Sequence, residues 1–176
     1  MNNIYKLVLS KLGPYNKLNI IAFIPLGFCA GLPLPLIGAT MSARLMDSGL
    51  SLTSIGLFAL AGTPYALKFL WSPLVDTINI PLFYKFLGKR KSWLVFTQIV
   101  LFLLFFLIGG LDPLKDLFLI ALLVFSAAFI SATQDIALDA YRIELHSDKE
   151  LAAGIATYVL GYRIALIFAG AGALYF

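Results

Sequence analysis

The sequence predicts an all-α integral membrane protein with about five transmembrane helices. Of the 176 residues, 61% are hydrophobic and only 12% are charged, and the mean hydropathy is +0.94. A soluble domain of this length needs far more polar surface, so we expect most of the chain to lie in membrane lipid. The net charge of +4 is small and concentrated in two segments. This pattern indicates a membrane topology signal and argues against nucleic-acid binding.

Five apolar stretches have about the 20 residues needed to cross a bilayer core of about 30 Å. They cover residues 18–40, 52–74, 92–110, 114–138 and 151–176. We therefore divide the chain into an N-terminal arm, residues 1–17, and a transmembrane bundle, residues 18–176.

Basic residues predict the orientation of these spans. The arm carries three lysines and no acid, and residues 85–91 carry four basic residues. Because basic loops remain in the cytoplasm, we expect the arm and the connection 75–91 to be cytoplasmic. The connection 142–150 is then cytoplasmic too, and the fifth span runs outward.

The first span contains Gly27, Gly31, Pro33, Pro35 and Gly38. Proline removes helix hydrogen bonds and glycine allows close helix approach, so we expect an irregular helix. Two interpretations remain open. The helix is either a kinked packing helix or a gating helix that lines a transport cavity.

The end of the fourth span carries the most informative residues of the chain. Asp135, Asp139 and Arg142 follow the spacing i, i+4, i+7, so they share one helix face. An ionisable group at membrane depth costs roughly 2.5–3.5 kcal/mol and usually faces a bundle interior or a water-filled cavity. This stripe therefore predicts a helix that handles protons, ions or a polar solute.

Each polar residue of the fourth span has two interpretations. Asp135 is either a titrating group that alternates between wet and paired surroundings, or the permanent ion-pair partner of Arg163 or Lys68. Gln134 is expected to hydrogen-bond across helices or to a solute. Asp139 and Arg142 form either a solvated helix end or a gate network between helices.

Two basic residues within other spans are further candidates. Arg163 lies about 12 residues into the fifth span, about 18 Å deep, where it needs an acid, a carbonyl or an anionic ligand unless it snorkels. Lys68 either belongs to the solute and proton pathway or snorkels past Trp71. Tyr162, next to Arg163, can hydrogen-bond a solute.

The sequence gives little support for catalysis. Cys29 is the single cysteine, and no metal-ligand spacing or nucleophile–base pair is present. The only histidine, His146, has the acidic neighbours Glu144 and Asp148, but we interpret it as a solvated loop residue. We expect no enzyme activity, no cofactor and no metal. A membrane scaffold without transport activity remains an alternative.

Several segments, taken in order, resemble the muropeptide permease (AmpG) branch of the major facilitator superfamily. These are LGFCAGLP (26–33), IGLFAL (55–60), PYALKFLWSPLVD (64–76), SATQDIALDAYR (131–142) and LGYR (160–163). The resemblance implies a proton-driven symporter of the bacterial inner membrane that imports anhydro-muropeptides for peptidoglycan recycling. It also implies two six-helix halves built from inverted three-helix repeats, of which this chain matches the N-terminal part.

The resemblance also implies a cytoplasmic gate. Superfamily members carry an acid and a glycine–basic–basic element between the second and third helices, and Asp76 with the segment 88–91 resembles them. By this analogy, Asp76, Arg90 and either Asp139 or Arg142 hold the cytoplasmic helix ends together.

The length of the chain and the identity of the transported solute each leave alternatives open. The superfamily fold has twelve helices and this chain five predicted spans, so it is an excerpt, the product of a split or decayed gene, or a piece that assembles with a separately encoded remainder. From the sequence alone we favour a split or decayed gene, which includes a non-functional membrane remnant. A related carrier of another solute, such as acetyl-CoA or a pterin, is the alternative transport function.

Overall fold

The computed structural model describes residues 13–172. Residues 1–12 of the predicted arm and 173–176 of the fifth predicted span lie outside the described residues. Within 13–172, four helical stretches are long and apolar enough to cross a membrane. They are Leu18–Asp47, Phe83–Gly109, Leu117–Leu145 and Glu150–Gly172. The prediction of an all-α membrane protein is confirmed.

The first stretch is a series of helices that follow one another without a loop. It consists of α2 (Leu18–Ile21), α3 (Phe23–Gly31), α4 (Pro33–Pro35), the π-helical turn η2 (Leu36–Thr40) and α5 (Met41–Asp47). The irregularity falls where the two prolines remove backbone donors. The predicted irregular helix is therefore present, and it continues beyond Thr40 to Asp47.

Residues 52–77 form short helices where the second span is predicted. These are α6 (Leu52–Phe58), the 3₁₀ turn η3 (Ala59–Gly62), α7 (Thr63–Leu67), the 3₁₀ turn η4 (Lys68–Leu70) and α8 (Ser72–Thr77). Pro64 and Pro73 lie in the first turns of α7 and α8, where proline favours the start of a helix. This segment is therefore a broken helix with two tight turns.

Three long helices complete the described chain. They are α9 (Pro81–Gly109), α10 (Leu117–Leu145) and α11 (Asp148–Ile167), which continues into the π-helical turn η5 (Phe168–Gly172). The backbone of Gly88 leaves the helical region, with φ 73° and ψ 178°, so α9 is kinked there. The basic residues 85–91 consequently flank this kink within α9.

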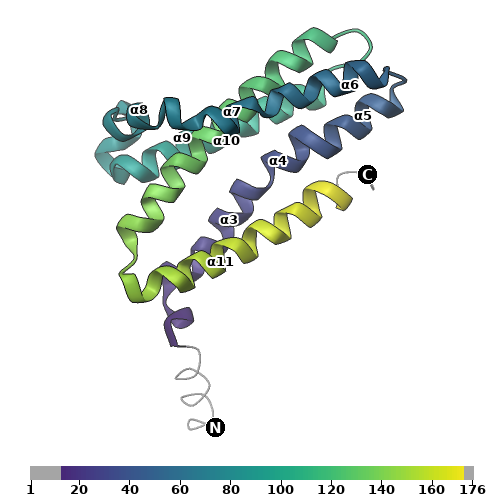
Figure 1. The fold of residues 1–176 in the computed structure, drawn as a ribbon. Coiled ribbons are helices and arrows are strands. Elements are labelled where there is room, and N and C mark those ends of the chain that lie inside the picture. Colours follow the sequence, from purple (N-terminus) through teal and green to yellow (C-terminus); the bar gives the residue numbers. More distant parts are fainter. Residues whose placement is uncertain (1–12, 173–176) are drawn as a thin grey trace.

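The long helices pack in two pairs: α3 runs parallel to α11, and α9 runs antiparallel to α10. Figure 1 shows α11 running beside α3 and α9 running beside α10. The elements α7, α8, α3 and α4 also contact α10. The buried side of α10 contains many small residues, among them Ala127, Ala128, Ser131 and Ala132. Small residues let neighbouring backbones approach closely, so α10 can take the central position.

Glycine makes the contact between α3 and α11 close. A Cβ atom on Gly161 would lie 1.9 Å from the carbonyl oxygen of Ile24, and one on Gly27 would lie 2.1 Å from that of Tyr158. Gly31 similarly faces α11 at Tyr162. Two of the first-span glycines thus serve helix packing.

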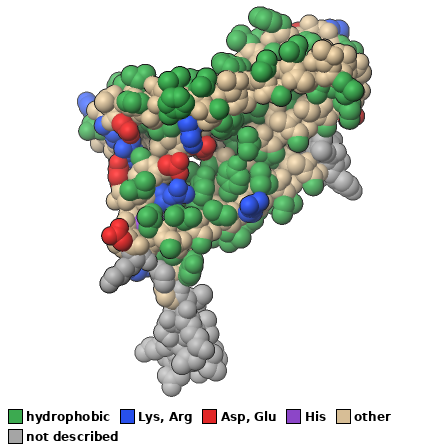
Figure 2. All heavy atoms as spheres, in the orientation of Figure 1, with side chains coloured by type: hydrophobic (Ala, Val, Ile, Leu, Met, Phe, Trp, Pro, Cys, Tyr) green, Lys and Arg blue, Asp and Glu red, His purple; other side chains and the backbone are tan. Residues whose placement is uncertain are grey.

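Two apolar clusters lie on either side, along the helix axis, of the polar part of α10. One gathers η2, α5, η3, α9 and α10 around Ile37, Leu45, Leu101 and Val124. The other joins α3, α8, α9 and α10 around Phe23, Val75 and Leu138. Large apolar side chains also cover much of the surface (Figure 2). Such a surface suits a lipid environment.

The connection between α9 and α10 is a tight turn closed by its own acids. The backbone N–H of Leu114 donates to Asp112 Oδ1 at 3.0 Å, and that of Asp112 donates to Asp116 Oδ2 at 3.1 Å. The Leu114 N–H, with Lys115 nearby, holds the pKa of Asp112 below its usual value. Arg44 donates to the carbonyls of Ile108 and Leu111 at 2.8 and 2.6 Å. These bonds satisfy carbonyls that the end of α9 leaves free.

The close α3–α11 contact yields a stability prediction. Gly161→Ala should destabilise the protein by about 2 kcal/mol, because the added methyl group overlaps the backbone of α3. Gly56→Ala is the matched control, since nothing lies within 4 Å of a Cβ atom at Gly56. Thermal unfolding in detergent, followed by circular dichroism, measures both. Equal melting temperatures for the two variants would contradict the packing role.

Candidate functional site

Four charged side chains meet on the face of α10 that was predicted from spacing. Lys68 Nζ lies 3.8 Å from Asp135 Oδ2 and 4.0 Å from Asp139 Oδ2. Arg142 Nη2 donates to Asp139 Oδ1 at 2.7 Å. We call Lys68, Asp135, Asp139 and Arg142 the ion cluster. It contains two cations and two carboxylates, so its formal charge is zero.

The ion cluster is open on one side. The side chains of Asp135 and Arg142 are 24% and 16% exposed, whereas those of Lys68 and Asp139 are 36% and 49% exposed. Figure 2 shows acidic and basic side chains side by side on the face in view. The cluster therefore joins the interior of the bundle to an accessible surface.

Aromatic residues border the ion cluster. The Cζ atom of Arg142 lies 5.0 Å from the ring centroid of Tyr158, a cation–π distance. The rings of Tyr158 and Tyr162 are 6.1 Å apart. The predicted site residue Tyr162 thus belongs to the aromatic border that α11 contributes.

The broken segment 63–77 positions Lys68 against α10. Lys68 begins the 3₁₀ turn η4. Close by, Trp71 Nε1 donates to Thr133 Oγ1 at 3.1 Å, and its ring stacks on Phe129 at 4.5 Å. Trp71 therefore holds this turn on α10. The ammonium of Lys68 lies beside two carboxylates, and its part in a solute and proton pathway stays a prediction.

An amide pair joins α10 to α9. Gln134 is 3% exposed, and its Nε2 donates to Gln98 Oε1 at 3.1 Å. The predicted hydrogen bond of Gln134 across helices is thus formed, to α9. Among the described residues, Gln134 Oε1 has no partner. Gln98 was missed from the sequence, although an amide within the apolar third span was a usable signal.

Arg163 is not brought to the ion cluster. It lies exposed on α11, and within residues 13–172 it forms no ion pair or side-chain hydrogen bond. Asp135 therefore faces Lys68 and not Arg163.

A second charged group ties together the helix ends at residues 76–80, 85–91 and 142–150, which we call the charged end. Arg90 Nη1 donates to Asp76 Oδ1 at 2.6 Å, and its Nη2 donates to Glu144 Oε1 at 2.7 Å. The structure thus joins Asp76 to Arg90, but Asp139 and Arg142 belong to the ion cluster. Glu144 takes the third position of this latch. Its signal in the sequence was an acid near the end of α10.

His146 differs from its predicted state. The expectation of a solvated loop residue is wrong, because His146 is only 8% exposed. Its Nδ1 lies 3.0 Å from the carbonyl oxygen of Arg142, and its ring stands 4.8 Å from that of Phe23. A Cβ atom on Gly154 would lie 2.7 Å from the ring. The short turn between α10 and α11 therefore folds the imidazole inward.

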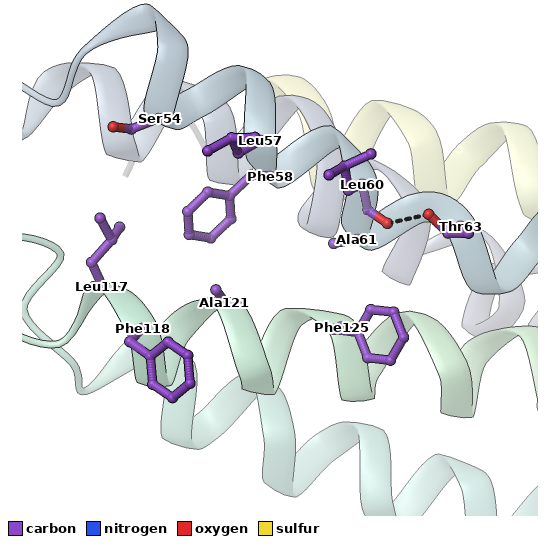
Figure 3. A pocket seen from close by; sticks show the side chains of 10 residues that line it. All are labelled: Ser54, Leu57, Phe58, Leu60, Ala61, Thr63, Leu117, Phe118, Ala121 and Phe125. Carbon is purple, nitrogen blue, oxygen red and sulfur yellow. Dashed lines mark hydrogen bonds between the residues drawn. The ribbon is translucent and has the colours of Figure 1, made fainter.

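An apolar cavity of about 730 Å³ lies between α6, η3 and α10 (Figure 3). Leucine and phenylalanine side chains line it, among them Leu57, Phe58 and Phe118, and its hydroxyl groups come from Ser54 and Thr63. The hydroxyl of Thr63 is engaged with the carbonyl of Leu60. None of the ion-cluster residues lines this cavity, so its chemistry suits hydrocarbon and not a polar solute.

Charged and amide groups inside an otherwise apolar, multi-pass helical bundle mark a functional site and are typical of membrane transport proteins. A family model described as acetyl-coenzyme A transporter 1 matches residues 19–118, more than half of the chain. The chain belongs to this transporter family, and relatives that are named AmpG or anhydromuropeptide permease match most of its length. The family predicted from sequence motifs is confirmed.

Three relatives illustrate the similarity. An anhydromuropeptide permease of Escherichia coli K12 is 41% identical over 150 residues, which are 85% of this chain and 30% of the relative. Putative transporter AmpG 3 of Rickettsia prowazekii is 38% identical over 162 residues, 92% of this chain and 38% of the relative. An uncharacterized protein of Haemophilus influenzae is 43% identical over 159 residues, 90% of this chain and 36% of the relative. The chain thus spans about a third of the length of these curated relatives.

The latch geometry yields a prediction. Arg90→Ala should weaken the charged end by about 1 kcal/mol, because Asp76 and Glu144 lose their shared cation and partly exposed pairs are worth about that much. Hydrogen exchange of backbone amides in residues 76–80 and 144–150 should then become about fivefold faster. Lys85→Ala is the control, since Lys85 is exposed on the same helix and forms no ion pair within residues 13–172. Equal exchange in both variants would argue against a latch.

Proposed function

We propose that this chain forms part of a proton-coupled importer of anhydro-muropeptides in the bacterial inner membrane. The ion cluster carries the proposal, because it places carboxylates that can titrate next to a cation inside a lipid-exposed bundle. The name of the Escherichia coli relative, an anhydromuropeptide permease, supports the solute class.

Asp135 is the proposed proton carrier. It is the more enclosed of the two carboxylates in the ion cluster, and it contacts only Lys68 among the cations that form ion pairs in residues 13–172. Asp139 is held by Arg142 at hydrogen-bond distance. A proton on Asp135 removes its attraction to Lys68, whereas Asp139 retains its own partner. Protonation is thereby converted into a change of contacts between η4 and α10.

The latch at the charged end is the proposed cytoplasmic gate. Arg90 holds Asp76 and Glu144, and Lys89 Nζ donates to the carbonyl of Asp76 at 2.7 Å. The concentration of basic residues at this end supports a cytoplasmic position and a cytoplasmic N-terminus. Opening and closing of this latch would alternate access to the ion cluster.

The relatives are about two and a half times as long as this chain, and we propose that the other wall of the transport site comes from a corresponding remainder. The exposed side of the ion cluster and the exposed Arg163 support this proposal, because unscreened charges facing lipid are costly. The remainder can belong to the same polypeptide or to a separately encoded one.

A carrier of acetyl-CoA or a similar anionic solute is the second candidate. The description of the matching family model favours it. Competition between labelled anhydro-muropeptide and excess acetyl-CoA distinguishes the two candidates.

Complementation of a muropeptide-uptake-deficient bacterium tests the proposed function. The gene is supplied alone and together with any downstream frame, and accumulation of anhydro-muropeptide is measured. We expect uptake in at least one arrangement. Absence of uptake in both, despite verified membrane insertion, would refute the proposal and favour a remnant or a different solute.

Asp135→Asn should reduce proton-driven accumulation of anhydro-muropeptide by about tenfold or more, because the amide cannot exchange a proton. Membrane insertion should be unchanged, since the amide has the size of the carboxyl group. Asp112→Asn, in the exposed α9–α10 turn, is the control. Uptake is measured with and without an uncoupler. Normal proton-dependent uptake in Asp135→Asn would remove Asp135 from the coupling mechanism.

A further inference from the structure

We propose that Lys68 binds a carboxylate of the transported solute, and that this carboxylate takes the place of Asp135 beside the ammonium group. The inference rests on the proposed transport function and specifies the solute as one with a free carboxylate. It also assigns different tasks to the two cations of the ion cluster.

Lys68 is charged but has free hydrogen-bonding capacity. Its Nζ lies 3.8 and 4.0 Å from the carboxylate oxygens, too far for hydrogen bonds. The ammonium has three donors, and none of them is engaged by another residue in the described part of the chain. An incoming carboxylate could therefore gain short, charge-assisted bonds that neither aspartate now makes.

Arg142 is unsuited to the same task. Its guanidinium already donates to Asp139 at 2.7 Å, stacks on Tyr158 and is only 16% exposed. Lys68 is more than twice as exposed, at 36%. Its backbone belongs to the 3₁₀ turn that Trp71 fastens to α10. A fixed backbone with a free, flexible ammonium is the arrangement expected of a ligand-binding lysine.

Charge balance links this exchange to the proton. The ion cluster is neutral when both aspartates are ionised, so a solute carboxylate makes it negative by one unit. An unbalanced charge is costly away from bulk water. Protonation of Asp135, displaced from Lys68, restores neutrality. Binding of the solute carboxylate and of one proton should therefore favour each other equally.

The other titratable groups around the ion cluster do not replace Asp135. Tyr65 on α7, with Tyr158 and Tyr162 on α11, interacts electrostatically with Asp135. Phenols remain neutral and guanidinium groups remain charged near neutral pH. Arg142 and Arg163 consequently hold constant charge, and Asp139 stays paired with Arg142.

Isothermal titration calorimetry tests the exchange. The protein, in lipid nanodiscs and in the arrangement that restores uptake, is titrated with an anhydro-muropeptide and with the same molecule after its carboxylates are converted to amides. We expect the wild type to prefer the carboxylate form by about tenfold or more. Lys68→Gln should lose this preference and Lys68→Arg should keep it. Lys115→Gln, at the opposite end and paired with Asp112, should behave as the wild type.

Proton uptake is measured in the same titrations with buffers of different ionisation enthalpy. The wild type should take up about one proton per bound carboxylate solute, and Asp135→Asn should take up none. Circular dichroism verifies that each variant is folded. Wild-type preference in Lys68→Gln, or binding without proton uptake in the wild type, would overturn the inference and leave transport standing. Binding of neither form by the wild type would overturn the proposed function, and this inference with it.

Discussion

Neutralisation of charge inside an apolar bundle is the constraint on which this structure depends. The second half of α10 brings two carboxylates and a guanidinium into surroundings where each needs a partner. The structure meets this need locally for Asp139, through Arg142, and across helices for Asp135, through Lys68. The helix that supplies Lys68 must therefore stay beside α10. Trp71, which donates to Thr133, keeps the 3₁₀ turn of Lys68 in that place.

The α3–α11 pair and the group of α8, α9 and α10 are held together by different interactions. Close backbone contact at Gly27 and Gly161 joins α3 to α11, and such packing has little freedom to slide. Ion pairs and long side chains join α8, α9 and α10 at the charged end. Interactions of the second kind can be broken and remade at small cost. The α3–α11 pair lies beside the helices that these ion pairs join (Figure 1), and this arrangement suits the proposed alternating access.

Polar and apolar openings are kept apart in the bundle. The ion cluster opens among tyrosines and charged side chains, whereas the cavity between α6 and α10 is lined by leucine and phenylalanine (Figure 3). A solute with sugar hydroxyls and carboxylates would find charged partners in the ion cluster, whereas the polar groups of the cavity are the hydroxyls of Ser54 and Thr63. This separation directs the proposed solute path along α10.

The sequence by itself determined the membrane class, the polar stripe of α10 and the family, because hydrophobic length, helical spacing and ordered motifs are local properties. Partner choice was decided by the tertiary structure. Lys68 rather than Arg163 faces Asp135, and Glu144 completes the latch, because both depend on which helix faces turn toward each other. His146 became buried for the same reason, since Gly154 on the next helix leaves room for its ring. Composition cannot reveal such contacts, which exist only once the helices are packed.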